Sequence, residues 1–340
     1  EPLGDSLLED LAVRYGRWGK SLPFHSERAC AQAFVKPLAA ADMALRAKEL
    51  SAKSTGCGAL VRCPPLAAWA VIRGDVAAAA SFARQDATLS HPNPVLGQAS
   101  AACVVLMARL AASGDRATAI AETKAWVEEE RGRIVARVGS HETQGWQHLS
   151  RGEQSRVSER VPGALQEWAP PGESLAAIDE LVGWLKRGLS DDAGELLTFQ
   201  STAAGHLLNH EVGSAEIPLV HALRHLKGGS SFETAMRATL AGGGDSSTNA
   251  AIVGGILGAA VGLEGIPERW IRAVLTCNTD DGQLRPPEYH PSTYLELLGQ
   301  MQKKSNYRRP PTLQPSHRGQ TGTYRSCLPI MLYAVEATVI

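Results

Sequence analysis

The chain has 340 residues, of which 44% are hydrophobic and 20% are charged, and its formal net charge is −1. These values predict a soluble globular protein with a large core, and a charge so close to zero gives no support for a nucleic-acid or membrane-surface partner. Aromatic residues make up only 5% of the chain while alanine is plentiful, which favours closely packed helices over sheets.

Apolar positions recur at helical spacing along most of the chain, so the sequence predicts an all-α protein. No stretch alternates convincingly at period two. The Ser230-x-x-Glu233 spacing predicts a capping box that opens one of the helices. The predicted helices cover residues 5–18, 38–50, 66–72, 97–112, 117–130, 174–189, 192–209, 218–226, 232–240 and the small-residue stretch that follows residue 248.

Two stretches of the chain have no clear period. Residues 131–172 are polar with scattered apolar positions, which predicts a variable insertion or mobile loop. Beyond about residue 303 the chain is basic and rich in Pro, Gly and Ser, so residues 303–340 are predicted to form a disordered tail. The predicted organisation is therefore one helical domain over residues 1–302, followed by the tail.

The cysteines and the apolar runs indicate the cellular compartment in which the protein is expected. The six cysteines form no CxxC pair, which favours reduced and mostly buried thiols. No signal peptide is visible, and the apolar run Leu328–Ile340 is too short to span a bilayer and contains Glu336. The sequence predicts a cytoplasmic protein without a membrane partner, and it leaves the oligomeric state open.

The most informative stretch is GGGDSSTNAAIVGGILGAAVG, residues 242–262. Its glycines allow a sharp turn, and Asp245 with the three hydroxyl residues after it offers hard oxygen ligands for Mg²⁺ or Ca²⁺. These groups stand at a predicted helix N-terminus, where free amides and the helix dipole attract phosphate. The alternative interpretation is that Thr248 or Ser247 is an ordinary N-cap and that the glycines only form a loop.

This stretch resembles the late motif of the ADP-ribosylglycohydrolase family, Gly-Gly-Asp-(Ser/Thr)-Asp-(Ser/Thr)-Asn-Ala-Ala-Ile. Residues 243–252 match it except at Ser247, where the family has a second aspartate. The segment STGCGALVR, residues 54–62, is similar to the family's Ser-x-Gly-Asn-Gly loop, with Cys57 in place of the asparagine. The segment SHPNP, residues 90–94, is similar to the family's Thr-His-Pro-x-Pro turn.

The resemblance implies a compact orthogonal bundle of many helices. It also implies hydrolysis of the N- or O-glycosidic bond that joins ADP-ribose to a protein side chain or small acceptor. In the family two Mg²⁺ ions hold the ribose hydroxyls and position a water. By this resemblance Asp245 is the catalytic residue and, together with Thr248, a metal ligand. The residues implied to line the site for ADP-ribose, or for an ADP-ribosylated protein, are Ser54, Gly56, Gly58, His91 and Ser246.

The chain also departs from the family pattern. The family's early Gly-Asp-Ala-x-Gly segment and Thr-Asp-Asp triplet are not matched, and Ser6–Trp18 resembles the helix after that triplet, which suggests an incomplete N-terminus. Residues 279–281 are Thr-Asp-Asp, but they lie far downstream in a polar loop and are not assigned to the triplet. Ser247 and Cys57 remove a carboxylate and an amide. The second hypothesis is therefore an inactive pseudoenzyme that binds ADP-ribose or a nucleotide, or is structural.

Two further residues have two interpretations each. Arg62 either contacts phosphate or ties its loop down through a carboxylate. His91 either lies near the ligand, as the resemblance implies, or bonds a backbone carbonyl in a proline-rich turn.

Two histidine pairs at i, i+4 spacing place both imidazoles on one helix face, as zinc ligands would be: His206/His210 and His221/His225. Neither forms the HExxH pattern of zinc proteases, so solvated or capping histidines are favoured.

Overall fold

The computed structural model describes residues 3–21, 23, 26–143, 171–191, 213–278, 290–293, 296, 297, 299 and 300. Over these described residues the fold is helical, and the β-pairing among them is one isolated bridge between Gly56 and Ser214. The all-α prediction is confirmed. The α-helices are α1 (Asp5–Lys20), α2 (Arg28–Ala33), α3 (Ala40–Ser51), α4 (Cys63–Arg73), α5 (Val76–Thr88), α6 (Pro94–Ser113), α7 (Arg116–Thr143), α9 (Pro171–Gly188), α10 (Glu216–Lys227), α11 (Phe232–Ala241), α12 (Ser246–Val261) and α13 (Glu268–Leu275), and the 3-10 helices are η1 (Cys57–Arg62) and η4 (Leu263–Gly265).

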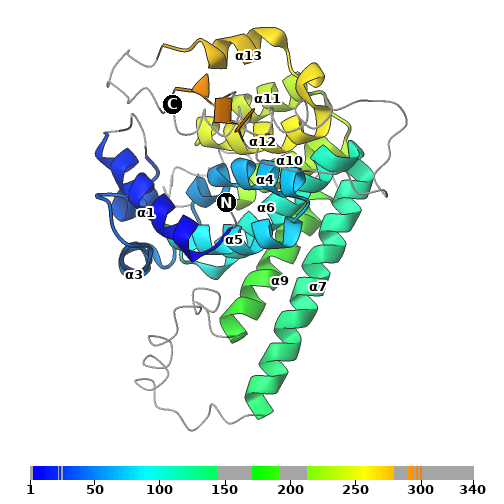
Figure 1. The fold of residues 1–340 in the computed structure, drawn as a ribbon. Coiled ribbons are helices and arrows are strands. Elements are labelled where there is room, and N and C mark those ends of the chain that lie inside the picture. Colours follow the sequence, from blue (N-terminus) through cyan, green and yellow to red (C-terminus); the bar gives the residue numbers. More distant parts are fainter. Residues whose placement is uncertain are drawn as a thin grey trace, which may run out of the picture.

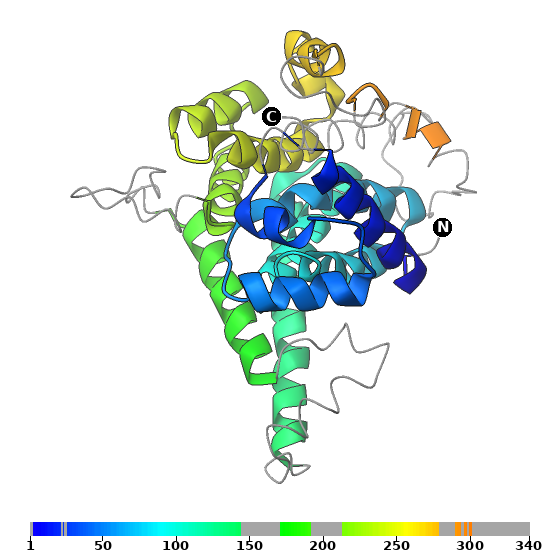
Figure 2. The same cartoon turned by 90° about the vertical axis from the view of Figure 1, so that its left-hand side faces the viewer.

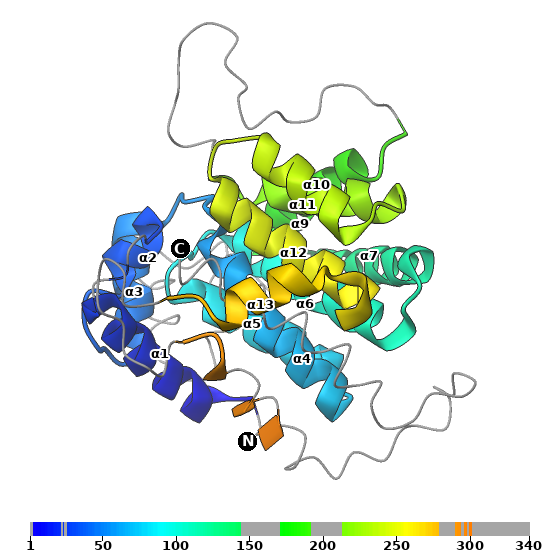
Figure 3. The same cartoon turned by 90° about the horizontal axis from the view of Figure 1, so that it is seen from above.

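Helix α6 is the centre of the bundle and packs against α4, α5, α7, α9 and α12 (Figures 1 and 3). It begins at Pro94, where the Asn93 side chain accepts the Val95 amide at 3.3 Å, and it ends at Ser113, followed by the C-cap Gly114 with φ 68°. By length and composition α6 passes as a membrane span, but 78% of its apolar window is buried inside the fold. That burial is the pattern of a central core helix.

Helix α12 is the second inner helix and packs against α6, α10, α11 and η1. Its small residues permit a close approach to its neighbours. A Cβ added at Gly255 would lie 3.3 Å from Pro64 Cγ of α4 and 3.8 Å from Met107 Sδ of α6. This packing holds the N-terminus of α12 beside η1 and the loop before it.

The N-terminal helices α1, α2 and α3 form a second cluster over one side of the bundle, drawn in blue in Figure 2. Its core includes Leu8, Phe34 and Met43, and Phe82 and Leu89 join it from α5 and the turn that follows. The cluster therefore fixes α2 against the C-terminal end of α5.

Helices α7 and α9 pack along each other and extend away from the body of the bundle (Figures 1 and 2). Residues 131–143 are helical, and residues 171 and 172 begin α9, which corrects the prediction of a loop for these parts of 131–172. The extension carries charged pairs at helical spacing, because Arg133 contacts Glu129 and Glu130. Residues 144–170, the predicted helix 192–209 and the predicted tail 303–340 lie outside the described residues.

Three of the described α-helices were not predicted, α2, α5 and α13, and the N-cap of α11 lies one residue from its predicted position. Helix α2 has six residues, too few for a periodic pattern, and α5 is capped by Asp75, whose Oδ1 accepts the Ala78 amide at 2.9 Å. The N-cap of α11 is Ser231, which accepts the Thr234 amide at 3.1 Å. The N-cap is therefore Ser231 and not the predicted Ser230. The Glu233 carboxylate forms ion pairs with Arg237 and Arg269 instead of a capping bond.

We expect Gly16→Ala to lower the free energy of unfolding by about 1–3 kcal/mol, the usual range for overpacking. A Cβ at Gly16 would lie 2.2 Å from the carbonyl oxygen of Lys36, and backbone cannot move aside cheaply. The control Gly183→Ala also adds alanine to a helix, but its Cβ meets only the end of Arg187, at 3.7 Å, so no loss is expected. Denaturant unfolding followed by circular dichroism measures both variants, and equal stabilities would contradict this packing.

Candidate functional site

Three segments far apart in the sequence meet at one junction: the loop 54–58, residues 213–215 and the start of α12. The Cys57 amide donates to the Gly213 carbonyl at 3.0 Å, and the Ala215 amide donates to the Thr55 carbonyl at 2.8 Å. The Cys57 thiol reaches Asp245 Oδ2 at 3.7 Å. The two glycine-bearing segments singled out by the sequence are therefore neighbours in the fold.

Asp245 occupies the N-cap position of α12, but its side chain makes no capping bond. Instead, Oδ1 accepts the hydroxyl of Thr248 at 2.8 Å, while Oδ2 faces Cys57. The preceding Gly243 and Gly244 have φ of 74° and 67°, a conformation that favours glycine. The carboxylate thus faces the loop 54–58 rather than its own helix, and neither Thr248 nor Ser247 is the N-cap.

Cys57 is fully buried between two carboxylates. Burial raises the pKa of its thiol well above the ordinary value, and the negative charges of Asp245 and Glu27 raise it further. The thiol is therefore neutral and donates weakly to Asp245, whereas an asparagine amide at this position would both donate and accept hydrogen bonds. The resulting junction has one half-buried carboxylate with a hydroxyl and a thiol as neighbours.

The donor set at Asp245 fits one Mg²⁺ ion. The carboxylate and the Thr248 hydroxyl are hard oxygen donors, and Thr248 keeps free lone pairs because it donates its hydrogen to Asp245. Within the described residues Asp245 does not belong to a cluster of three ionisable metal-ligand side chains. Among the described residues, Asp245 is therefore the single carboxylate that this donor set offers.

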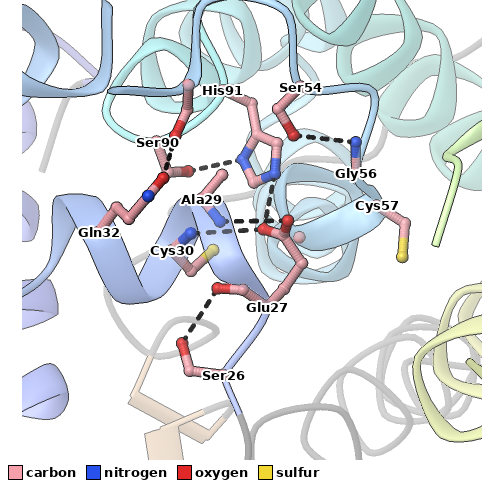
Figure 4. A network of polar contacts seen from close by, with 12 residues as sticks. Ser26, Glu27, Ala29, Cys30, Gln32, Ser54, Gly56, Cys57, Ser90 and His91 are labelled. Atoms are coloured by element: carbon pink, nitrogen blue, oxygen red, sulfur yellow. Dashed lines mark hydrogen bonds and ion pairs between the residues drawn. The ribbon is translucent and has the colours of Figure 1, made fainter. Parts of the chain in front are cut away.

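His91 lies behind the loop 54–58, with its side chain fully buried (Figure 4). Its Nε2 is 2.9 Å from Glu27 Oε2, and its Nδ1 is 2.8 Å from the hydroxyl of Ser90. Gly58 passes directly against the ring, because an added Cβ would lie 2.9 Å from His91 Cε1. His91 thus packs against the inner side of the loop. A direct contact between His91 and ADP-ribose stays a prediction, and the full burial of the side chain argues against it.

Glu27 is the partner that sequence reasoning missed. Its carboxylate caps α2 by accepting the amides of Ala29 at 3.1 Å and Cys30 at 3.3 Å. Burial alone would raise the pKa of Glu27, but the contact with His91 and the two amides outweigh it and lower the pKa to about 2. Glutamate is not a preferred N-cap residue and α2 is very short, so no pattern in the sequence marks this position.

Arg62 ties the loop down through a carboxylate, the second of its two interpretations. Its Nε donates to Asp86 Oδ2 at 2.8 Å, and its Nη1 donates to the Gly58 carbonyl at 2.9 Å. The other oxygen of Asp86 accepts the hydroxyl of Tyr15 at 2.8 Å. Although burial opposes its charge, Asp86 keeps the pKa of Arg62 above the ordinary value. Arg62 therefore fixes the position of the loop from inside the fold.

The other predicted site residues lie at the same junction. Ser54 accepts the Gly56 amide at 3.2 Å, and a Cβ on Gly56 would lie 2.6 Å from Glu27 Oε1. Ser246 is the first residue of α12, beside Asp245. The structure thus gathers Ser54, Gly56, Ser246 and Asp245 at this junction, with His91 set behind the loop.

One of the two histidine pairs, His221 and His225, falls within the described residues. His221 and His225 both lie on α10, and His225 Nδ1 contacts the hydroxyl of Ser230 at 3.1 Å. Neither belongs to a cluster of metal-ligand side chains within the described residues. The pair His206/His210 lies outside them.

The comparisons with known proteins agree with the resemblance. The family model described as ADP-ribosylglycohydrolase matches residues 3–295. The chain therefore belongs to the ADP-ribosylglycohydrolase family. No curated protein and no solved structure matches the chain.

We expect Arg62→Met to lower the free energy of unfolding by about 3–5 kcal/mol, because it leaves the buried carboxylate of Asp86 without its cation. The matched control is Arg14→Met, which removes an exposed arginine whose Nε lies 2.7 Å from Asp10, and we expect a change below about 1 kcal/mol. Denaturant unfolding of both variants gives the two values. A loss at Arg62 as small as that at Arg14 would contradict the role of the buried pair.

Proposed function

We propose that this chain binds ADP-ribose units at the junction of loop 54–58 and α12 and hydrolyses their N- or O-glycosidic bond to a protein side chain or small acceptor. One observation carries the proposal. Asp245, the residue that the resemblance implies to be catalytic, stands at the start of α12, and its carboxylate faces the loop 54–58 instead of capping the helix. Family membership supplies the substrate class, an ADP-ribosyl group.

The start of α12 and the loop 54–58 offer groups that suit the diphosphate and the distal ribose of such a ligand. The first amides of α12 have no partner within the helix, so with Ser246 they offer donors to a diphosphate. Gly56 lets the loop backbone approach a ligand closely because it carries no side chain. Ser54 orients this part of the loop by accepting the Gly56 amide. The proposal assigns the diphosphate to these groups and the distal ribose to Asp245.

We infer a dependence on Mg²⁺ from the donor set of Asp245 and Thr248. When bound there, Mg²⁺ would supply positive charge to the ribose hydroxyls and lower the pKa of a water. Thr248 holds the carboxylate in place through its 2.8 Å hydrogen bond. One carboxylate, substrate oxygens and waters are a sufficient ligand set for this ion.

A second candidate function is binding of ADP-ribose without turnover. Two observations favour it. Ser247 carries no charge where the family has a second aspartate, and the neutral thiol of Cys57 faces Asp245 where the family has an amide. Both weaken the hold on Mg²⁺ while leaving the loop and the helix start in place.

Isothermal titration with ADP-ribose, with and without millimolar Mg²⁺, tests the site. We expect Mg²⁺ to strengthen binding by about tenfold, or roughly 1.4 kcal/mol, and Asp245→Asn to abolish this effect because it removes the charged ligand. Asp75→Asn is the matched control, since Asp75 is a helix N-cap outside the junction. A Mg²⁺ effect that survives in Asp245→Asn would refute the assignment of the metal to this residue.

Turnover separates the two candidate functions. Release of free ADP-ribose from peptides ADP-ribosylated on arginine or serine supports the hydrolase, and binding without release supports the second candidate. We expect Ser247→Asp to strengthen Mg²⁺ binding and to raise any turnover, because it adds a carboxylate beside Asp245. Ser231→Asp adds the same charge at the N-cap of α11 and should change neither quantity.

A further inference from the structure

Three side chains of the types that can bind metal ions come together on the inner side of the loop 54–58. Glu27 is the N-cap of α2, Cys30 comes from the first turn of that helix, and His91 comes from the turn after α5 (Figure 4). Their ligating atoms, Glu27 Oε2, Cys30 Sγ and His91 Nε2, all lie within 4.8 Å of one another. The imidazole of His91 is fully buried and the Cys30 residue is nearly so, while the Glu27 side chain is 19% exposed. The packing of α2 against α5 therefore brings an oxygen, a sulfur and a nitrogen donor to one point.

The Nε2 atom of His91 lacks a proper hydrogen bond. It lies 2.9 Å from Glu27 Oε2 as an ion-pair contact, but this contact does not have the geometry of a well-directed hydrogen bond. A buried polar atom without a hydrogen bond is uncommon and needs a physical explanation. A cation bound between Nε2 and Oε2 would be a partner for both atoms.

Ser90 leaves Nε2 available for such a partner. Its hydroxyl oxygen lies 2.8 Å from His91 Nδ1 and already accepts Arg62 Nη1 at 3.0 Å. The same oxygen can accept a proton carried on Nδ1, which leaves a lone pair on Nε2. Histidine ligands of metals are commonly oriented in this way by a hydrogen bond at the other ring nitrogen.

Gly58 keeps the space between the three ligands free of a side chain. A Cβ added there would lie 2.8 Å from Cys30 Sγ, 2.9 Å from His91 Cε1 and 3.1 Å from Glu27 Oε2. The φ angle of Gly58 is not positive, so its glycine is explained by this space and not by backbone conformation. The point that such a methyl group would fill lies among the three side chains.

We propose that Glu27, Cys30 and His91 bind a divalent transition metal of the zinc class. One carboxylate oxygen, one thiolate and one imidazole nitrogen are a donor set for Zn²⁺ and not for Mg²⁺, which takes oxygen ligands. Three protein ligands leave one tetrahedral position for water or a small ligand. The charges balance, because the carboxylate and thiolate neutralise the ion and the nearby Arg62 is already paired with Asp86.

This site is separate from the proposed site at Asp245 and does not depend on it. The residues Gly56 and Cys57 lie between the two, since Gly56 faces Glu27 and the Cys57 thiol faces Asp245. A metal held by Glu27, Cys30 and His91 would join α2 to the turn after α5 on the inner side of loop 54–58. It would therefore hold in place the loop that the proposed ADP-ribose site uses.

Titration of the full chain with Co²⁺, which takes the same ligands and reports thiolate coordination by its absorption, tests the proposal. We expect one equivalent of thiolate-bound cobalt, seen as a thiolate-to-cobalt absorption band that Zn²⁺ displaces. Cys30→Ser should abolish the band. Cys277→Ser, which removes a more exposed thiol, and Asp245→Asn should both keep it. No band, a band that persists in Cys30→Ser, or a band lost in Asp245→Asn would overturn the assignment.

Two measurements keep the test decisive if Cys30→Ser does not fold. X-ray absorption of the zinc-loaded wild-type chain should give one sulfur and nitrogen or oxygen neighbours, and a sulfur-free sphere would refute the site. Ser90→Ala should weaken zinc affinity by about 10–100-fold, the usual effect of losing the group that orients a histidine ligand. An unchanged affinity would contradict the role of Ser90. Since Asp245→Asn removes the proposed Mg²⁺ effect but not the cobalt band, the failure of one proposal is distinguishable from failure of the other.

Discussion

The buried ion pair between Arg62 and Asp86 is the interaction on which the arrangement of the site depends. Asp86 lies near the end of α5 and also accepts the hydroxyl of Tyr15 from α1. Arg62 ends η1 and reaches the carbonyl of Gly58 and the hydroxyl of Ser90. A buried charge is stable only while its partner stays in place, so these elements are fixed together.

The junction at Asp245 follows from the packing of small residues. Because Gly255 lets α12 lie against α4 and α6, the start of α12 reaches the loop that precedes η1. Two glycines with positive φ then turn the chain so that Asp245 faces Cys57. The chemistry of the site thus depends on helix-to-helix distance, which is set by residues that have no reactive group.

The sequence was sufficient for the elements whose signals are local. Helix α6 was predictable because a long apolar run lies between Asn93-Pro94 and Gly114. The pairing of Asp245 with Thr248 came from the family resemblance, and the two side chains are in contact in the structure. Helix α5 was missed because its alanine-rich sequence gives little contrast between faces and because Asp86 is polar but buried. The burial of the Asp86 carboxylate is explained by its ion pair with Arg62, which comes from another element. Likewise, Cys57 and Asp245 are 188 residues apart, so only the fold brings them together.

The position of Asp245 has a consequence for how this protein can change over evolutionary time. Helix α12 starts without a side-chain cap, whereas Asp75 and Ser231 cap their helices. A missing cap costs about 0.5–2 kcal/mol. Selection for thermal stability alone would favour a side chain that turns back onto the helix amides. Because the Asp245 carboxylate faces the loop 54–58 instead of these amides, the start of α12 is less stable than a capped helix start would be.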